Sequence, residues 1–300
     1  MIRRLVISSI LFLSFAGGAQ AQQMWMYNAN QFNIFDVNHA FAGQYDDASF
    51  ALRYRNQWLN IKGAPRTGML SMHAPMGESI GGGMQVRQES IGLHNWTFIK
   101  LVIAYHFEIN KSRLAFALAP GFAGAKFDSG GAYTLTAEQT NFAPRGSWAL
   151  NADFSMLYWS ERILAGIQVS NLNTPDLNYI SIAGVLSRHV DAFVAYTYPI
   201  DRHAIKPILS TRFIPGGKMS FDASAQFFWR EQIWVGAGWR SGNSIFGLME
   251  FELGKGLRAG YTFDFFSDQR LPSSRGSHEI FLAMNFALSK SSAQSIRYFK

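Results

Sequence analysis

Apolar and polar residues alternate along several segments of this chain. In 219–230 the intervening residues are polar apart from Phe228, and every second residue is apolar: Met219, Phe221, Ala223, Ala225, Phe227 and Trp229. A period of two is the pattern of a β-strand with one apolar and one polar face. The pattern recurs in 205–213, 233–239, 257–265 and 280–288. We therefore expect an all-β protein.

The first 21 residues have the features of a secretory signal peptide. Arg3 and Arg4 precede an apolar run, and Ala19 and Ala21 form a small-x-small cleavage site. We expect cleavage after Ala21 and export of the mature chain. No later run has the roughly 20 apolar residues that a transmembrane helix needs. The chain is then periplasmic, secreted or an outer-membrane barrel.

Loop lengths distinguish these alternatives. Fourteen strands are predicted, at 48–60, 67–75, 79–88, 94–108, 112–128, 147–159, 162–172, 187–198, 204–214, 218–229, 231–241, 244–254, 256–266 and 276–288. Every second connection is tight, whereas 129–146, 173–186 and 267–275 are long. Short turns at one rim and longer loops at the other are typical of outer-membrane barrels. In a soluble sandwich the apolar faces would instead meet in one core.

We therefore predict a transmembrane β-barrel of about 14 antiparallel strands over 48–288, in the outer membrane and in contact with its lipid. Residues 22–47 are not strand-like and are interpreted as a periplasmic lead-in or a plug. They contain the aromatic residues Trp25, Tyr27, Phe32 and Phe35. Residues 289–300 are predicted to be a periplasmic tail. Barrels of about eight strands are filled by side chains, and barrels of 16–18 strands hold a channel. A barrel of about 14 strands lies between these sizes, so its lumen would leak without a plug.

Composition excludes several kinds of chemistry. The chain has no Cys, which excludes disulfides, thiolate metal sites and a cysteine nucleophile. Its seven His are scattered, so no metal site is expected. No cofactor and no nucleic-acid partner are predicted either. Residues 77–81 match G-x-S-x-G, but a nucleophile elbow requires a strand–turn–helix and this segment joins two strands. In Ser277-His278-Glu279, alternation turns His278 away from its neighbours, which argues against a triad. No enzyme is predicted.

The inward faces of the predicted strands collect many charges. Acidic side chains on those faces are Asp153, Asp191, Asp222, Glu250, Glu252 and Asp264. The basic candidates for the lumen or for partner binding are Arg53, Arg55, Lys100, Arg113, Lys206, Arg212, Arg230, Arg240 and Arg258. Two interpretations remain open: an interior stitched together by ion pairs and water, or a surface that holds a polar, strand-like ligand.

Short motifs in a fixed order resemble a known family. They are Val37-Asn38-His39-Ala40-Phe41-Ala42-Gly43, Tyr54-Arg55-Asn56-Gln57-Trp58, Pro65 with Thr67, Gly81-Gly82-Gly83, Gly260-Tyr261-Thr262-Phe263-Asp264, and Gly276-Ser277-His278-Glu279-Ile280. In order and spacing this set is similar to the PorP/SprF-type membrane protein of the type IX secretion system of Bacteroidota. His39 stands where the family usually has Pro. The resemblance runs from about 37 to 288.

The resemblance implies an outer-membrane barrel that works in protein secretion and gliding motility. It implies periplasmic ring partners of the PorK/PorN (GldK/GldN) type and secreted cargo recognised through its C-terminal domain. Whether such a barrel serves general export or the surface anchoring of one adhesin stays open at this point. The alternatives are a general porin or hydrophobe-uptake channel, and an outer-membrane enzyme.

Overall fold

The computed structural model describes residues 32–44, 47–128, 145–177, 185–217, 219–230, 232–242, 244–254, 256–266 and 274–287. The predicted signal peptide, the first part of the lead-in, most of 129–146 and the predicted tail lie outside the described residues. None of the helices in the described ranges is long and apolar enough to cross a membrane.

The strands follow the predicted order closely. They are β1 (Asp47–Asn56), β2 (Arg66–Pro75), β3 (Ile80–Ile91), β4 (His94–Ile109), β5 (Ser112–Phe127), β6 (Arg145–Trp159), β7 (Ile163–Ser170), β8 (His189–Tyr196), β9 (Tyr198–Ile200), β10 (His203–Phe213), β11 (Ser220–Trp229), β12 (Ile233–Arg240), β13 (Ser244–Gly254), β14 (Leu257–Phe266) and β15 (Ser277–Ala287). Two short 3-10 helices, η2 (Ile34–Asp36) and η3 (His39–Phe41), precede them.

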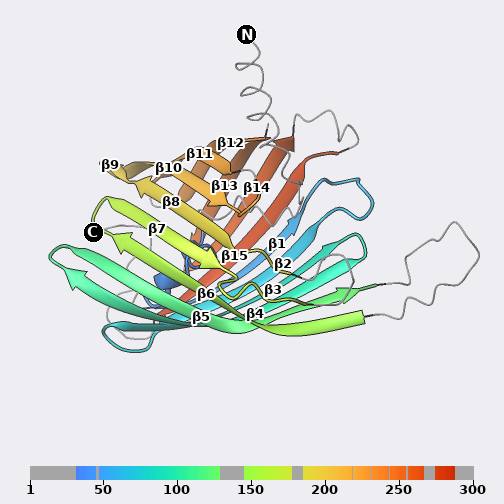
Figure 1. Ribbon diagram of the computed structural model, residues 1–300. Coiled ribbons are helices and arrows are strands. Elements are labelled where there is room, and N and C mark those ends of the chain that lie inside the picture. Colours follow the sequence, from blue (N-terminus) through green and yellow to red (C-terminus); the bar gives the residue numbers. More distant parts are fainter. Residues whose placement is uncertain are drawn as a thin grey trace, which may run out of the picture.

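The sheet closes on itself. Neighbouring strands pair antiparallel around the ring, β15 pairs with β1, and β10 pairs with β11. The segments β8 and β9 are separated at Thr197 and both pair with β10, whereas the predicted strand 187–198 covers β8 and only the first residue of β9. The labelled segments therefore form a barrel of 14 strands, which confirms the predicted fold class. Figure 1 shows the tilted strands enclosing η2 and η3, drawn in dark blue.

The two faces of the wall differ as the alternation predicts. On β4, Leu101 and Ile103 are 60% and 61% exposed on the outer face, while Lys100 and Val102, which alternate with them, are buried. On β11, Phe221 is exposed and Gln226 is buried. A closed barrel leaves no unpaired edge, and an apolar outer band suits the hydrocarbon of a bilayer. The polar residues consequently gather inside.

Candidate functional site in the barrel interior

Residues 32–44, which we call the inner segment, lie inside the barrel. Phe35 and Phe41 are buried in a cluster with Val102 of β4 and with Ala115 and Ala117 of β5. The small alanines on β5 leave room for the two aromatic rings. The Phe41 ring also stacks on Trp159, with ring centroids 6.1 Å apart. The interior is therefore packed around the chain's own N-terminal segment.

Asn38 fixes the turn between η2 and η3 and ties it to the wall. Its side-chain oxygen accepts a hydrogen bond from the Ala40 backbone N–H at 3.1 Å, as an N-cap residue does. Its amide nitrogen donates to the carbonyls of Met156 and Ile167, at 3.0 and 3.1 Å. These carbonyls belong to the paired strands β6 and β7. One side chain thus orders the inner segment and anchors it to two strands.

Glycines in the wall make room for this segment. A Cβ on Gly166 would lie 2.6 Å from the Asn38 amide nitrogen, and one on Gly83 would lie 2.7 Å from the Phe35 ring. A Cβ on Gly81 would overlap the backbone of Ala42. Gly43, which faces Gly81, has φ +70°, a conformation that favours glycine. The glycine-rich motif on β3 is therefore part of the surface against which the inner segment packs.

A chain of buried ion pairs joins the inner segment to the wall. The Asp36 carboxylate lies 2.7 Å from the Arg53 guanidinium, and Arg53 lies 3.3 Å from Glu279. Arg55 then bridges Glu279, at 3.2 Å, and Asp264. All five side chains are at most 4% exposed. Burying this much charge is tolerable because each carboxylate faces a guanidinium.

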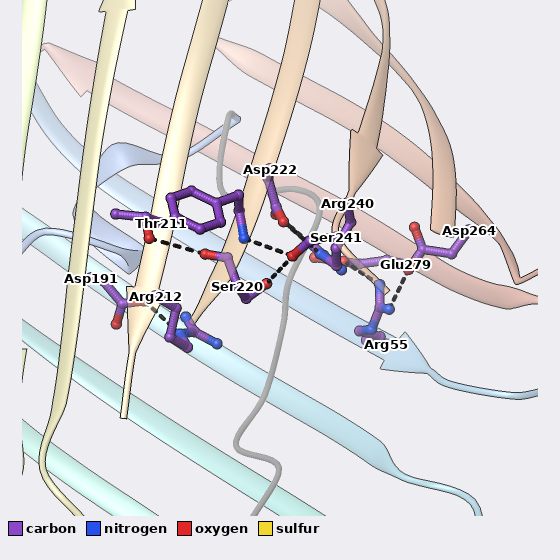
Figure 2. Close-up of polar contacts among 11 residues, drawn as sticks. Arg55, Asp191, Thr211, Arg212, Ser220, Asp222, Arg240, Ser241, Asp264 and Glu279 are labelled. Atoms are coloured by element: carbon purple, nitrogen blue, oxygen red, sulfur yellow. Dashed lines mark hydrogen bonds and ion pairs between the residues drawn. The ribbon is translucent and has the colours of Figure 1, made fainter. Parts of the chain in front are cut away.

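The same network brings together separate sequence motifs. Asp36 precedes the Asn38 motif, Arg55 comes from β1, and Asp264 and Glu279 come from β14 and β15. Figure 2 shows Arg55 between Asp264 and Glu279. These motifs are far apart in the sequence, and in the fold their charged residues together hold the inner segment in register with the wall.

Further contacts fasten both ends of the inner segment. Arg258 donates to the Phe32 carbonyl at 3.2 Å and also pairs with Glu250 at 3.3 Å. Asn33 donates to the Ser71 hydroxyl at 3.2 Å. The Gly43 backbone N–H donates to His73 Nδ1 at 3.3 Å.

His39 has a different character from these charged contacts. It is buried, and its Nδ1 lies 3.9 Å from the Asp153 carboxylate, which accepts a bond from Lys100 at 2.8 Å. Burial lowers the pKa of His39 to about 4, against the opposing effect of Asp153. The ring is therefore neutral near pH 7, and Lys100 is the cation that balances Asp153.

A cavity of about 80 Å³ remains beside the inner segment, against β7, β8 and β10–β13. One side is apolar, with Ile34, Val37 and Phe246 among its residues. The other carries two ion pairs, Arg212 with Asp191 and Arg240 with Asp222, the latter at 2.7 Å. Figure 2 shows these pairs next to the hydrogen-bonded Thr211 and Ser220.

Six of the nine predicted basic residues are buried on the inward face, and three are not. Arg113 is exposed at the rim, where it pairs with Glu108 at 3.2 Å, and Arg212 is partly buried. Arg230 follows the end of β11 with φ 47° and lies over the Trp229 ring, so the turn removes it from the inward face. The others are at most 7% exposed on the inward face: Arg53, Arg55, Lys100, Lys206, Arg240 and Arg258.

The remaining motif residues lie mainly at one rim. The Gln57 N–H donates to the Pro65 carbonyl at 2.9 Å, which closes the β1–β2 connection. The Trp58 N–H donates to the Ser277 hydroxyl at 3.2 Å. His278 Nδ1 contacts the Tyr261 hydroxyl at 2.6 Å, on the opposite face from the buried Ser277 and Glu279. Tyr54 is half exposed outside, and Thr67 is buried.

Sequence reasoning did not identify Asp36 as a site residue, although it is the first acidic residue of the chain. The available signal was a lone acidic residue in an apolar segment, ahead of strands whose inward faces are rich in Arg. The described residues contain no group of three His, Cys, Asp or Glu that could hold a metal ion.

The sequence matches the family model of the type IX secretion system membrane protein PorP/SprF over residues 19–284. This chain belongs to the PorP/SprF family. That family is a component of a secretion system and not an enzyme family. This chain's closed barrel and its apolar outer band place this PorP/SprF protein in the outer membrane. No curated protein matches the sequence.

Solved structures share the fold of this PorP/SprF member at low identity. The toluene transporter TbuX of Ralstonia pickettii has a TM-score of 0.55 at 8% identity, covering 84% of this chain and 92% of that one. The CymD monoaromatic hydrocarbon channel has a TM-score of 0.53 at 11% identity, covering 91% and 95%. A TodX deletion mutant, also a monoaromatic hydrocarbon channel, has 0.51 at 10%, covering 91% and 97%. These similarities show the fold alone.

Proposed function

We propose that this protein is the outer-membrane barrel that couples the periplasmic ring of the type IX system to export or surface anchoring of cargo bearing a C-terminal domain. The structural observation that carries the proposal is the filled interior. Residues 32–44 pack across the lumen and are held by the Asp36–Arg53 pair and by Asn38. A barrel blocked in this way is better suited to a protein that binds partners than to one that lets solutes pass freely.

The proposal includes an orientation in the membrane. The connections 76–79, 110–111 and 160–162 are short, and they lie at the rim where β1 begins and β15 ends. Outer-membrane barrels keep short turns on the periplasmic side. The two chain ends then extend into the periplasm, where ring proteins of the PorK/PorN (GldK/GldN) type would bind. Residues 22–31 and 289–300 are the proposed contacts.

A hydrophobe-uptake channel is the second candidate. The cavity that includes Ile34, Val37 and Phe246 favours it, because it combines apolar walls with a polar end. The similar structures TbuX and CymD are a toluene transporter and a monoaromatic hydrocarbon channel. Their identity to this chain is 8% and 11%, so the likeness does not extend to a ligand.

Deletion of the gene separates the two candidates. Cargo with a type IX C-terminal domain should disappear from the medium and from the cell surface, while uptake of toluene and sensitivity to small antibiotics stay unchanged. The complemented strain is the control. A deletion strain that secretes normally and takes up the hydrocarbon more slowly would exclude the secretion role and favour the channel.

A further inference from the structure

The outward face of the barrel wall carries little charge. Outward positions alternate with the buried residues along each strand, as Leu52 and Tyr54 do on β1. Among the described side chains at these positions, two are charged: Arg66, which begins β2, and Lys126, close to the end of β5. Both are basic and exposed. The described strands place no acidic side chain on this face, so the charge that it carries is positive.

Arg66 and Lys126 belong to one row across neighbouring strands. Arg66 pairs with Ser90 on β3, and Ser90 pairs with Asn95 on β4. Asn95 pairs with Lys126, which ends the row on this side. On the other side of Arg66 the row continues to Asn56 on β1. We call these five residues the polar row. Adjacent strands lie about 4.8 Å apart, so the two cations are separated by about 14 Å along it. Figure 1 shows β1 to β5 side by side, in blue to green.

Towards the middle of the barrel, the outward face below the polar row becomes weakly polar and then apolar. The next outward row on β2 to β5 holds Gly68, Gln88, Thr97 and Gly124. Nothing lies within 4 Å of a Cβ placed on Gly68, so the surface is open there. The row after that is apolar and holds Leu70, Val86, Ile99 and Phe122. This order, from cations to hydrocarbon, is that of a lipid headgroup above its acyl chains.

The same rim has a different outward face on the strands that follow. Near this rim, the exposed outward residues of β10 to β14 are apolar or aromatic: Phe213, Phe221, Trp239, Ile245 and Phe265. Long basic side chains often extend from a membrane protein into the headgroup layer. If that were the whole reason for Arg66 and Lys126, similar residues would be expected around the circumference. Their confinement to β2 and β5 favours a local ligand.

We propose that the polar row binds the phosphate groups of a glycolipid in the outer leaflet, and that the apolar row below it contacts the acyl chains of the same lipid. In the orientation proposed above, the rim opposite the short turns faces outwards. The polar row then lies at the level of the outer-leaflet headgroups. This inference rests on that orientation and not on the secretion role.

Charge and shape favour a phosphate-bearing glycolipid over other occupants. An Arg guanidinium binds phosphate oxygens through two parallel hydrogen bonds, and a Lys ammonium binds them as a point charge. Ser90 and Asn95, between the two cations, can hydrogen-bond the hydroxyl groups of a sugar. A soluble anion would gain nothing from the apolar row. A zwitterionic lipid would bring its own ammonium group close to Arg66 and Lys126, where like charges repel.

Lipid retention by the purified full-length protein tests the two cations. Diphosphorylated lipid A is added in detergent, and the bound molecules are counted by native mass spectrometry. The double variant Arg66→Gln, Lys126→Gln should retain at least about tenfold less lipid A than the natural protein, because it loses charge-assisted hydrogen bonds to phosphate. The matched control, Lys111→Gln with Arg202→Gln, removes one Lys and one Arg from exposed positions in the short turns. It should retain lipid A as the natural protein does.

A glycine substitution tests the surface without a change of charge. Gly68→Leu fills the open space below the polar row and should reduce the retention of lipid A several-fold. Gly247→Leu is its control, because Gly247 lies on β13, away from the polar row, and also has nothing within 4 Å of its Cβ position. Both variants should still migrate faster on a gel before boiling, so a loss of lipid would not reflect a loss of the fold.

The choice of probe separates a lipid from other anions. Dephosphorylated lipid A and phosphatidylethanolamine should be retained at least about tenfold less, because they lack the negative headgroup charge that the cations attract. Inorganic phosphate should not displace lipid A. Equal retention by the two double variants, or equal retention with and without the lipid phosphates, would overturn the inference. Displacement by inorganic phosphate would do so too, since it would show an anion site that needs no lipid. These measurements use purified protein, so they can fail or succeed whether or not the deletion strain secretes cargo.

Discussion

The Asp36 carboxylate lies 2.7 Å from the Arg53 guanidinium, and this contact joins the short helical turn inside the barrel to its wall. Both side chains are 1% exposed. Arg53 also reaches Glu279, which pairs with Arg55, so the inner segment is continuous with a charged network across β1 and β15. Loss of one member leaves its partner charged in a place that water does not reach.

Asp36→Asn should therefore destabilise the folded barrel, by about 3 kcal/mol as is typical when one partner of a buried ion pair is removed. Adding Arg53→Gln to that variant should cost less than the sum of the two single changes, because both single changes already remove the same Asp36–Arg53 contact. Urea unfolding of the protein in lipid vesicles measures both. Arg113→Gln is the control: its 47% exposed side chain should contribute less than about 1 kcal/mol.

Gly81→Ala should displace the inner segment. The added Cβ would overlap the Ala42 backbone, which cannot move aside like a flexible side chain. We expect a barrel that still forms but exposes residues 32–44 to protease in detergent. Gly247→Ala is the matched control, because nothing lies within 4 Å of its Cβ position. Equal protection of the two variants would show that the segment tolerates a shift at β3.

The strands were predictable because a membrane barrel imposes one simple rule on each of them. The alternation in 219–230 placed β11 (Ser220–Trp229) with the correct face inward, since each residue there meets either lipid or lumen. Periodicity failed where the chain leaves the strand. It assigned Arg230 to the lumen, but a positive φ ends the alternation after Trp229.

The position of the inner segment was beyond a local pattern. Asp36 meets Arg53, and Asn38 meets the carbonyls of Met156 and Ile167, through contacts between distant parts of the chain. No periodicity encodes such pairs. The predicted strand 162–172 also extended beyond Ser170, where β7 ends. Its sequence carries no signal that the chain leaves the strand there and that Leu177 is buried inside the barrel.

The register of β11 predicts opposite effects for neighbouring positions. Ala225→Arg puts a charge on the exposed outer face and should cost roughly 2–4 kcal/mol if it lies near the bilayer midplane. Ser224→Arg points to the polar lumen and should cost clearly less. Folding yield into lipid vesicles over a urea series gives the comparison. A larger penalty at Ser224 would mean that the faces are reversed.

Closure of the barrel predicts heat-modifiability. In detergent, the mature protein should migrate faster on a gel before boiling than after it, because the closed β1–β15 pairing keeps the unboiled chain compact. The β1 variant Leu52→Pro removes a backbone donor and should abolish the faster band. Tyr54→Phe, an outward change in the same strand, should leave it. Identical migration of the unchanged protein in both states would contradict a closed barrel.

The last prediction concerns the chain ends and the proposed ring partners. Lys290, Arg297 and Lys300 give residues 289–300 a basic character that an acidic periplasmic surface would attract. Replacing all three with Ala should reduce co-purification of the ring proteins from solubilised outer membranes, while the barrel stays heat-modifiable. Raising the ionic strength should likewise reduce co-purification with the natural protein, and the difference between it and the Ala variant should shrink, because salt screens such contacts. Replacing Lys62 and Arg66, at the opposite rim, removes charge without touching the proposed periplasmic side and should leave co-purification unchanged. If the two sets of changes act alike, the ring proteins do not bind through this tail.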